Sequence, residues 1–375
     1  MKFSCSSKSF KNVLFMVEKA IPKQSTLPVL QNLFLSLKDG KLLVRGNDLE
    51  MGIETTLSVD SEDSMGSVLV KSKTLTDVVS KLQSDSINFF VDEKHTLHVN
   101  TSDVQFKLLG LPISDYPAFP SLDKGKHIQL PVSVLRELIK LTLFSVSFDD
   151  TKKFLNGVLL SYENSSLTCI STDGFRLSLK SVNLGVDLDP FSVIVPYKAI
   201  NEVLRILSIF EENKIVSIAV SDSQISFSCD SFLLISRLVQ GQFPDFNKVI
   251  PDSFEHSIKI SRRQFLQSCE RANIIASSSN DTVKICYHDA VIDLKAQASN
   301  LGDFFETLPI VLSKGGKPLN ISFNIKLIMD FLRVVEDDDF YLCFNNEVSP
   351  CRFTISSDPN YTYIVMPIRT RDFNG

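Results

Sequence analysis

Three stretches of the chain repeat one pattern of apolar and polar positions. In each, a short alternating segment leads into apolar residues at i, i+3, i+4 and i+7, the spacing that aligns side chains along one face of an α-helix. The stretches cover residues 68–82, 193–207 and 321–335 and align without gaps. One aligned column is always lysine, at Lys73, Lys198 and Lys326, and the column four residues later is acidic, at Asp77, Glu202 and Asp330. The pattern predicts a strand–helix unit that recurs after 125 residues (198 − 73) and again after 128 (326 − 198).

A second strand–helix pattern begins at Phe3, Ile128 and Ile258, with offsets of 125 (128 − 3) and 130 (258 − 128) residues. Runs with apolar residues two apart, such as 218–229, indicate hairpins with one buried face. Proline-containing segments at 109–120 and 241–251 predict extended connectors, because proline removes a strand hydrogen-bond donor. We expect an α+β chain with six short helices and roughly two dozen short strands. We also expect three domains of one fold, at residues 1–125, 126–253 and 254–375.

Composition narrows the class of protein. The 375 residues are 43% hydrophobic and carry a formal net charge of −5, which is ordinary for a globular protein with more than one core. Seven cysteines are scattered and never form a CxxC motif, so neither a disulfide framework nor a zinc site is expected. The sequence has no signal-peptide core and no apolar stretch long enough to span a membrane. We therefore expect a reduced, cytoplasmic protein without membrane association.

Each predicted helix carries lysine or arginine outside its apolar stripe. These cations are Lys8 and Lys11; Lys73 and Lys81; Arg136 and Lys140; Lys198 and Arg205; Arg262, Arg263 and Arg271; and Lys326 and Arg333. A solvated helix face explains each set taken alone. Their recurrence in an acidic chain instead favours a shared basic surface that contacts phosphates without reading base sequence. The acidic column follows the lysine column at a spacing that suits i,i+4 ion pairs, which would weaken such a surface.

Signals of catalysis are weak. The sequence lacks GxSxG, Walker A, GxGxxG and HExxH motifs, and the pair His95 and His98 has no evident third metal ligand. Two alternatives to a DNA-binding protein stay open. One is a repeat-built adaptor that binds only proteins, and the other is a hydrolase or sugar-binding enzyme with Asp149 or Asp173 as its acid–base group. No nucleophile, base and orienting group form a recognisable set, which disfavours the enzyme.

Seven local motifs, in order along this repeat, match one family. They are the N-terminal Met1-Lys2-Phe3 and the segments 26–33, 47–50, 154–157, 171–177, 243–246 and 365–369. The chain resembles the bacterial DNA polymerase III beta subunit, the replicative sliding clamp, over essentially its whole length. The resemblance implies three tandem copies of the DNA clamp fold, each with two helices packed on antiparallel sheets, which form half of a ring. It also implies a head-to-tail homodimer closed around double-stranded DNA, with no catalytic activity, cofactor or metal.

The resemblance further implies which residues form the sites. A hydrophobic partner-binding cleft between the second and third domains corresponds to Leu155, Thr172, Gly174, Arg176, Leu177, Pro244, Val249, Ile364, Val365, Met366, Pro367, Ile368 and Arg369. The helix cations and the family's loops together give the residues expected to face DNA: Lys23, Gln24, Lys73, Arg136, Lys140, Lys152, Lys153, Phe154, Lys198 and Arg205. Contacts between the two copies correspond to Phe106 and Leu108 in the first domain and to Ile274 and Ile275 in the third. The implied partners are duplex DNA without sequence preference, a second copy of the chain, the DNA polymerase III catalytic subunit, the clamp-loader ATPase complex and other replication and repair proteins.

Two features depart from the family pattern. Family chains usually end soon after the segment matching 365–369, whereas residues 370–375 follow here. This polar tail is expected either to lie beside the cleft and alter access to it or to be disordered. The loops expected to contact DNA carry Lys23-Gln24 and Lys152-Lys153-Phe154, where an arginine and paired aromatic residues are familiar. Both loops keep positive charge.

Overall fold

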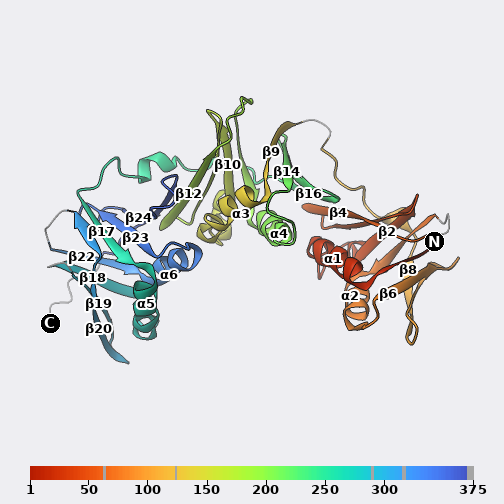
Figure 1. Cartoon of the computed structure of the whole chain (residues 1–375), viewed down its shortest axis with the longest axis horizontal. Helices are drawn as coiled ribbons and strands as arrows, with labels where there is room; N and C mark the ends of the chain where they lie inside the picture. Colours follow the sequence, from red (N-terminus) through yellow and green to blue (C-terminus); the bar gives the residue numbers. More distant parts are fainter. Residues whose placement is uncertain (62–64, 123–124, 289–290, 315–317, 370–375) are drawn as a thin grey trace. The chain divides into compact units, whose positions relative to one another are not determined.

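The computed structural model describes residues 1–61, 65–122, 125–288, 291–314 and 318–369. The chain divides into two compact units, and Figure 1 shows the helices and strands that belong to them. Unit 1 comprises Met1–Leu135 and Asn201–Leu238, and unit 2 comprises Arg136–Ile200 and Val239–Gly375. Helices α3 (Val132–Lys140) and α4 (Tyr197–Leu207) each contribute residues to both units.

Unit 1 is built on a twelve-stranded antiparallel sheet with the order β1-β6-β7-β8-β5-β2-β3-β4-β16-β15-β14-β9. Its strands are β1 (Lys2–Ser6), β2 (Asn32–Lys38), β3 (Lys41–Asn47), β4 (Met51–Ser58), β5 (Gly66–Lys71), β6 (Ser86–Val91), β7 (Thr96–Asn100), β8 (Gln105–Leu111), β9 (Lys126–Pro131), β14 (Ile215–Val220), β15 (Gln224–Cys229) and β16 (Phe232–Arg237). Helices α1 (Ser7–Val17) and α2 (Ser72–Lys81) pack against each other, and α1 also packs on β4. Short 3₁₀ helices lie at η1 (Glu18–Ala20), η2 (Pro28–Gln31) and η3 (Ile113–Asp115).

Unit 2 contains two antiparallel sheets. The nine-stranded sheet has the order β13-β10-β11-β12-β25-β24-β23-β17-β21, and the four-stranded sheet has the order β20-β19-β18-β22. The strands of the first sheet are β10 (Gly157–Glu163), β11 (Ser166–Thr172), β12 (Arg176–Asn183), β13 (Phe191–Pro196), β17 (His256–Ser261), β21 (Leu312–Lys314), β23 (Asp339–Phe344), β24 (Cys351–Thr354) and β25 (Tyr361–Val365). Those of the second are β18 (Thr282–His288), β19 (Val291–Ala298), β20 (Gly302–Pro309) and β22 (Leu319–Asn324).

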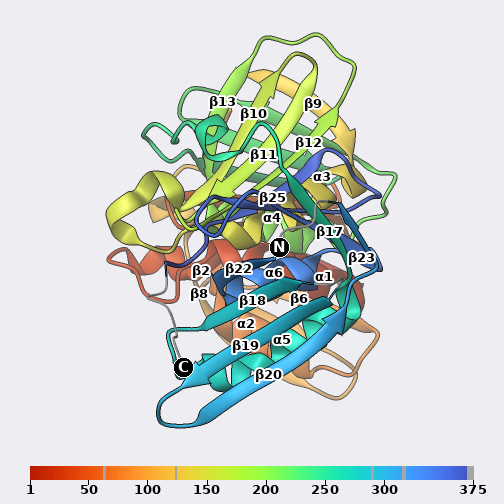
Figure 2. The ribbon, with the colours of Figure 1, turned by 90° about the vertical axis from the view of Figure 1, so that its left-hand side faces the viewer.

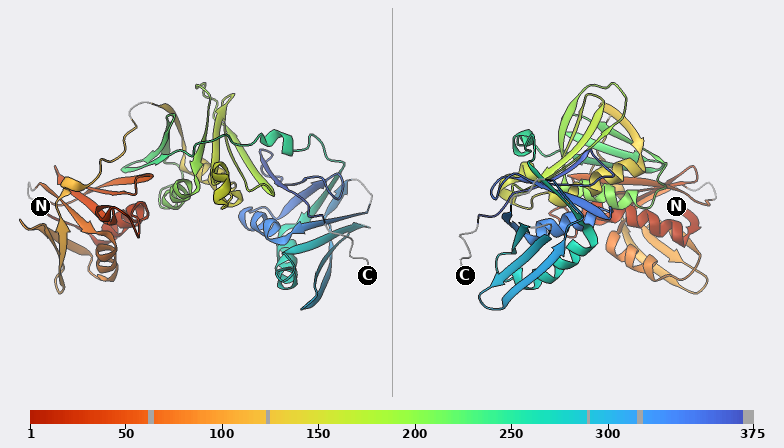
Figure 3. Two further views of the ribbon diagram at one scale, coloured as in Figure 1. Left: turned by 180° about the vertical axis from the view of Figure 1, so that it is seen from behind. Right: turned by 60° about the vertical axis from the view of Figure 1, so that its left-hand side comes forward.

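Helices α5 (Arg262–Ala276) and α6 (Ile325–Val334) pack against each other in unit 2. Figure 2 shows α5 alongside β18, β19 and β20, and Figure 3 shows the same layer from two further directions. Asn324 caps α6, because its side-chain oxygen accepts a hydrogen bond from the Lys326 N–H at 2.9 Å. Unit 2 also has the 3₁₀ helices η4 (Leu143–Ser145), η5 (Asp150–Leu155) and η6 (Phe246–Val249).

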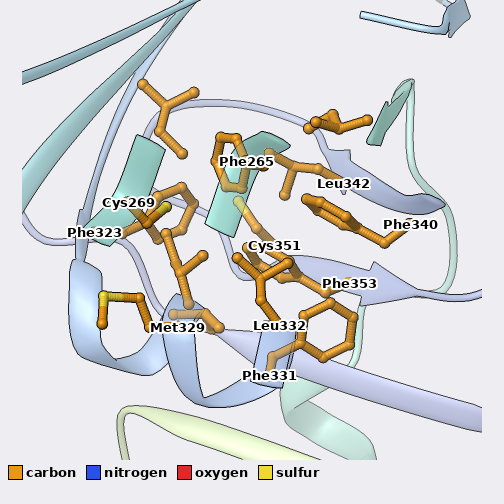
Figure 4. Close-up of a cluster of buried hydrophobic side chains, with 14 of the residues drawn as sticks. Phe265, Cys269, Phe323, Met329, Phe331, Leu332, Phe340, Leu342, Cys351 and Phe353 are labelled. Atoms are coloured by element: carbon orange, nitrogen blue, oxygen red, sulfur yellow. The ribbon is translucent and has the colours of Figure 1, made fainter. Parts of the chain in front are cut away.

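Aromatic side chains dominate the core between α5, α6 and the last strands (Figure 4). Phe331 of α6 stacks on Tyr363 of β25 with ring centroids 5.3 Å apart, and it meets Phe353 of β24 edge-on at 5.5 Å. Each fully buried phenylalanine contributes about 1.5–3 kcal/mol of transfer free energy, so this cluster is a major source of stability for unit 2.

Two-residue turns set the strand registers. Asp39 and Gly40 join β2 to β3 with φ values of 49° and 68°, and Asn164 and Ser165 join β10 to β11 at 51° and 61°. Two successive positive φ angles match the right-handed twist of the flanking strands. The turns occur at the same place in two repeats, 125 residues apart (164 − 39).

The predicted helices are confirmed within the described residues. In the part of the chain that the structure describes, six α-helices fall in the six repeated segments, and 25 strands accompany them. The predicted apolar stripes face inward, since Leu75, Val79, Val203 and Leu332 are completely buried. In the described segments, no helix is both long and apolar enough to cross a membrane. The division into domains at 125 and 253 stays a prediction.

One strand pairing in each unit joins successive repeats. In unit 1, β4 pairs with β16, from Met51 opposite Ser236 to Thr55 opposite Phe232. In unit 2, β12 pairs with β25, from Arg176 opposite Val365 to Lys180 opposite Tyr361. Strands β4 and β12 start 125 residues apart (176 − 51), which is the offset of the repeat. These pairings are named the first seam and the second seam.

Candidate partner-binding patch and cationic helix faces

An apolar surface covers one side of the second seam. Leu177 of β12 and Ile364 of β25 lie opposite each other and are buried together with Leu159, Ile170 and Ile194. Six half-buried apolar side chains pack on this small core and leave part of their surface exposed: Phe154, Leu179, Val239, Phe243, Phe246 and Ile250. These eleven residues are named the seam patch. Its members come from both sides of the seam and from the connector before β17, so the patch depends on the seam being formed.

A tight turn holds Arg176 beside the patch. The carboxylate of Asp173 accepts backbone hydrogen bonds from Phe175 at 2.9 Å and Arg176 at 3.0 Å. Gly174 has φ +93°, and a Cβ there would meet nothing within 4 Å, so glycine is favoured by backbone conformation and not by lack of space. The turn leaves the Phe175 ring 68% exposed.

The Arg176 guanidinium is fixed on three sides. Its Nε donates to Asp173 Oδ2 at 3.0 Å, its Nη1 donates to Asp330 Oδ2 at 2.6 Å, and its Cζ lies 5.5 Å from the centre of the Phe144 ring. The Arg176 side chain is only 10% exposed. A buried guanidinium needs such partners, so Arg176 is held rigidly at the end of the seam.

The segment after β25 is tied down by alternate backbone hydrogen bonds. Met366 N–H donates to the Phe175 carbonyl at 2.8 Å, and Ile368 N–H donates to the Ser322 carbonyl at 2.7 Å. Pro367 between them has no N–H to donate. Met366, Pro367 and Ile368 are half-buried, so their side chains remain partly available at the surface.

The structure brings the sequence-based cleft residues together in unit 2. Leu155, Leu177, Ile364, Val365 and Thr172 are buried, whereas Gly174, Pro244, Val249 and Arg369 are exposed. Their role in binding stays a prediction. The tail 370–375, expected beside the cleft or disordered, lies outside the described residues.

Sequence reasoning missed several apolar side chains of this surface. Phe175, Phe243, Phe246, Val239 and Ile250 were not among the expected cleft residues. The motif 243–246 signalled two of them, since its phenylalanines flank a proline in a connector and have no strand to bury them. Phe154, expected to face DNA, is itself part of the seam patch and packs on its buried core, and a Cβ at Gly241 would lie 3.2 Å from the Phe154 Cβ. A contact between Phe154 and DNA stays a prediction.

The loop before β10 carries exposed positive charge, as expected of a loop that contacts DNA. Lys152 and Lys153 are exposed on η5, where the Asp149 carboxylate accepts a hydrogen bond from the Thr151 N–H at 2.9 Å. Phe148 on the same loop is 72% exposed and meets the Tyr197 ring edge-on at 4.9 Å. Lys23, Gln24, Lys73 and Lys198 are exposed as well, and Arg136 is half-buried.

Several helix cations have acidic partners. Lys140 pairs with Glu336 at 2.5 Å, Lys326 with Asp281 at 2.8 Å, and Arg333 with Glu270 at 3.2 Å. Arg271 binds both carboxylate oxygens of Glu306, and this hydrogen bonding lowers the pKa of Glu306. Pairing of this kind reduces the net charge that a helix face presents to phosphates.

Two members of the acidic column, Glu202 and Asp330, each bind an arginine. Glu202 pairs with Arg205 one turn later, at 2.5 Å, and the Arg205 guanidinium lies 4.0 Å from the centre of the Phe15 ring on α1. Asp330 pairs with Arg176, 154 residues away, while Lys326 turns to Asp281. Of these side chains, Asp330 and Arg205 contact a neighbouring repeat, which the seams place next to the helix. The DNA-facing role predicted for Arg205 remains to be tested, although its guanidinium is already engaged.

The residues expected at the copy–copy contact lie on strand β8 and helix α5. Phe106 and Leu108 of β8 are half-buried, Ile274 on α5 is 69% exposed, and Ile275 is half-buried against the unit 2 core. Strand β8 pairs with β7 along its length but with β5 only through Gly110 and Leu111. Among the described strands, β20 pairs with β19 alone.

Comparisons with known proteins agree along the whole chain. Family models of the DNA polymerase III beta subunit match three times: the N-terminal domain at residues 1–120, the central domain at 129–245 and the C-terminal domain at 247–369. The beta sliding clamp of Staphylococcus aureus is 30% identical over 378 residues, covering 99% of this chain and 100% of the relative. That of Synechocystis is 30% identical over 392 residues, covering 98% and 99%.

Solved structures give the same result. The sliding clamp of Bacillus subtilis matches with a TM-score of 0.91 at 27% identity, covering 99% of this chain and all of that one. The Pseudomonas aeruginosa clamp, solved bound to griselimycin, matches with a TM-score of 0.93 at 26% identity and the same coverage. The fold is therefore three tandem clamp domains, as expected from the sequence, and the family is one of non-catalytic processivity factors, which argues against the hydrolase alternative. The chain belongs to the DNA polymerase III beta subunit family, the sliding clamps of bacterial DNA replication.

Proposed function

We propose that two copies of this chain form a closed ring around duplex DNA and tether the DNA polymerase III catalytic subunit, together with other replication and repair proteins, through the seam patch. The observation that carries the proposal is the seam patch itself. It leaves phenylalanine and aliphatic side chains partly exposed, next to the turn that holds Arg176. Such a surface suits short peptide segments that insert apolar side chains and are offered by several partners.

The repeat supports self-association. Strands of the three repeats can be matched by their neighbours in the sheets. Strands β8, β16 and β25 then hold equivalent places, and so do β4, β12 and β20. The first two repeats each pair these strands within the chain, which leaves β8 and β20 as the pair for a third seam. Both edges carry apolar side chains, with Leu109 86% exposed and Phe305 61% exposed. A second copy would cover them, since an open apolar edge is otherwise prone to aggregation.

The correspondence also gives a register for this third seam. In the first seam Ile53 lies opposite Leu234, and in the second Ser178 lies opposite Tyr363. In β20 the residue that corresponds to Ile53 and Ser178 is Phe304, which pairs with Ala296 of β19. In β8 the residue that corresponds to Leu234 and Tyr363 is Phe106, which pairs with Val99 of β7. The third seam would therefore set Phe106 opposite Phe304 of the second copy, and Lys107 opposite Asp303. An aromatic contact and an opposite-charge pair both stabilise antiparallel strands.

Exposed cations support contact with DNA. Lys23, Lys73, Lys152, Lys153 and Lys198 are exposed. Lysines of this kind attract phosphates without reading bases, so binding should fall steeply with salt. Retention on DNA would then come from ring closure, not from affinity.

The test measures topology directly. Light scattering should report a dimer at micromolar concentration. The clamp, loaded by its ATPase complex onto nicked circular DNA, should stay bound through gel filtration and leave when the circle is cut. A stable monomer, or binding that depends on salt but not on cutting, would count against the ring and favour a protein adaptor or simple electrostatic association.

A further inference from the structure

The second seam has a polar inner row. Along β12, Arg176, Ser178 and Lys180 alternate with Leu177 and Leu179, so they face away from the seam patch. Each has a partner within unit 2: Arg176 binds Asp330, Ser178 donates to the Leu141 carbonyl, and Lys180 binds Asp358. A buried row of this kind requires every polar group to be satisfied.

The first seam shows that the fold does not demand this polarity. The same three places in β4, 125 residues earlier, hold Met51, Ile53 and Thr55. These residues are buried, at 2%, 0% and 1% exposure. A row without charged side chains therefore serves the same strand pairing elsewhere in the chain, and the charges of the second seam call for a separate explanation.

Lys180 and Asp358 form a buried ion pair at the end of the seam opposite Arg176. They are 8% and 9% exposed, and the Lys180 ammonium also lies 3.4 Å from Glu137 Oε1 on α3. The other oxygen of the Asp358 carboxylate accepts the Asn360 N–H at 3.1 Å, and its carbonyl accepts the Tyr361 N–H at 3.3 Å. Asp358 is thus fixed to the turn that starts β25, while Lys180 lies opposite Tyr361, the first residue of that strand.

A buried ion pair adds little net stability over a well-packed apolar pair, but it can specify one register. The apolar pattern alone rejects a slip of one residue, because that would turn Tyr361 and Tyr363 to the opposite face. It does not reject a slip of two residues, which keeps every side chain on its face. Such a slip moves the strands by about 6.6–6.8 Å and would separate the two buried charges.

We propose that the Lys180–Asp358 pair is the register key of the second seam: it selects the alignment in which Leu177 lies opposite Ile364 and the seam patch is complete. Both are positioning residues, since neither belongs to the patch. The inference rests on the proposed function in one respect, namely that the patch binds partner proteins. Its structural part, the choice of register, stands apart from any partner.

The test combines two readouts. The register is read by disulfide formation between introduced cysteines. The pair Leu179→Cys and Thr362→Cys reports the observed alignment. Leu179→Cys combined with Asn360→Cys or with Ile364→Cys reports a slip of two residues in either direction. Partner binding is read by surface plasmon resonance on immobilised DNA polymerase III catalytic subunit. Each is measured in the parent and in the double variant Lys180→Met/Asp358→Leu, with Thr55→Val at the corresponding place of the first seam as the matched control.

The parent and Thr55→Val should form only the disulfide of the observed alignment. The apolar double variant should melt close to the parent temperature, form slipped disulfides as well, and bind the polymerase about tenfold more weakly. Unchanged disulfides and unchanged affinity would overturn the register key and leave the pair a purely structural feature.

A charge-swapped variant, Lys180→Asp/Asp358→Lys, covers the case in which the apolar variant does not fold. It should form only the disulfide of the observed alignment, and slipped disulfides in it would overturn the proposal. If the parent itself fails to bind the polymerase, the proposed function fails, while the disulfide pattern still decides the register.

Discussion

Arg176 of β12 donates a hydrogen bond to Asp330 of α6 across 154 residues of sequence, at 2.6 Å between Nη1 and Oδ2. The arginine belongs to one repeat and the aspartate to the next. Because Arg176 also borders the seam patch, the ion pair couples the position of α6 to the geometry of the proposed binding surface. The acidic column of the repeat has, at this position, a role in joining repeats.

Asp330→Asn should weaken both the contact between α6 and β12 and the binding of partner proteins. The Asp330 carboxylate is 36% exposed, so we expect a loss of only about 1–2 kcal/mol in unfolding free energy, within the range for a hydrogen bond to a charged group. Polymerase affinity should fall by about tenfold, because the turn that contains Arg176, at the edge of the seam patch, loses one of the ion pairs that anchor it. Chemical denaturation and surface plasmon resonance measure the two effects.

Asp77→Asn is the matched control, since Asp77 holds the same column in the first repeat and its side chain is exposed. It should leave polymerase affinity unchanged. Equal losses in both variants would mean that the effect comes from net charge and not from the ion pair with Arg176.

The register of the third seam can be read by cross-linking. A chain carrying Phe106→Cys and Phe304→Cys should form disulfide-linked dimers on mild oxidation, because the proposed third seam would set these residues opposite each other in two copies. Electrophoresis without reductant measures the linked species. The matched control carries Phe106→Cys and Glu306→Cys, two residues out of register, and efficient linking in the control alone would disprove the deduced alignment.

Acid should remove the contribution of Asp293 to stability. Burial opposes its charge, but hydrogen bonds from His288 at 2.8 Å and Thr307 at 2.7 Å lower the pKa of the Asp293 carboxyl. A pKa lowered in the folded state gives stability that is present above the unfolded value and is lost as pH falls through the folded one. Asp293→Asn should therefore lower the unfolding free energy at pH 7 by about 1–3 kcal/mol. The difference in unfolding free energy between the parent and the variant should shrink as the pH falls.

Thr307→Val serves as the companion variant, because it removes one of the two hydrogen bonds and keeps the carboxylate. Its loss should be smaller and should follow the same acid dependence. If the stability difference between the parent and Asp293→Asn grew on acidification, the pKa of Asp293 would be raised, not lowered.

The thiols should be inert until the protein unfolds. All seven cysteines are free and buried, and burial raises the pKa of both Cys5 and Cys169 to about 12. Since the thiolate is the reactive form, a disulfide reagent at pH 8 should label almost no thiol in the native protein and all seven in denaturant. Rapid labelling of the native chain would contradict the burial of these side chains.

The sequence was a good guide to local structure and a poorer one to partners. Apolar spacing located all six helices, because the stripe at Leu75 and Val79 reflects the periodicity of the helix itself. It could not show that Arg205 would lie against Phe15, since that contact depends on which strands pair between repeats. Phe154 is expected to face DNA from its place in a loop, and that place alone could not show that its side chain packs against the buried core of the seam patch. Side chains are placed by their tertiary neighbours, and those neighbours come from the seams.

The two compact units do not coincide with the repeat. The middle third of the chain is divided between them, with residues 136–200 in unit 2 and 201–238 in unit 1. If each compact unit unfolds as one body, hydrogen exchange should reveal two cooperative blocks instead of three. A fragment cut to the middle repeat alone would expose both of its seam strands, β12 and β16, without their partners β25 and β4. Strand pairing between neighbouring repeats therefore makes the middle repeat dependent on both of the others.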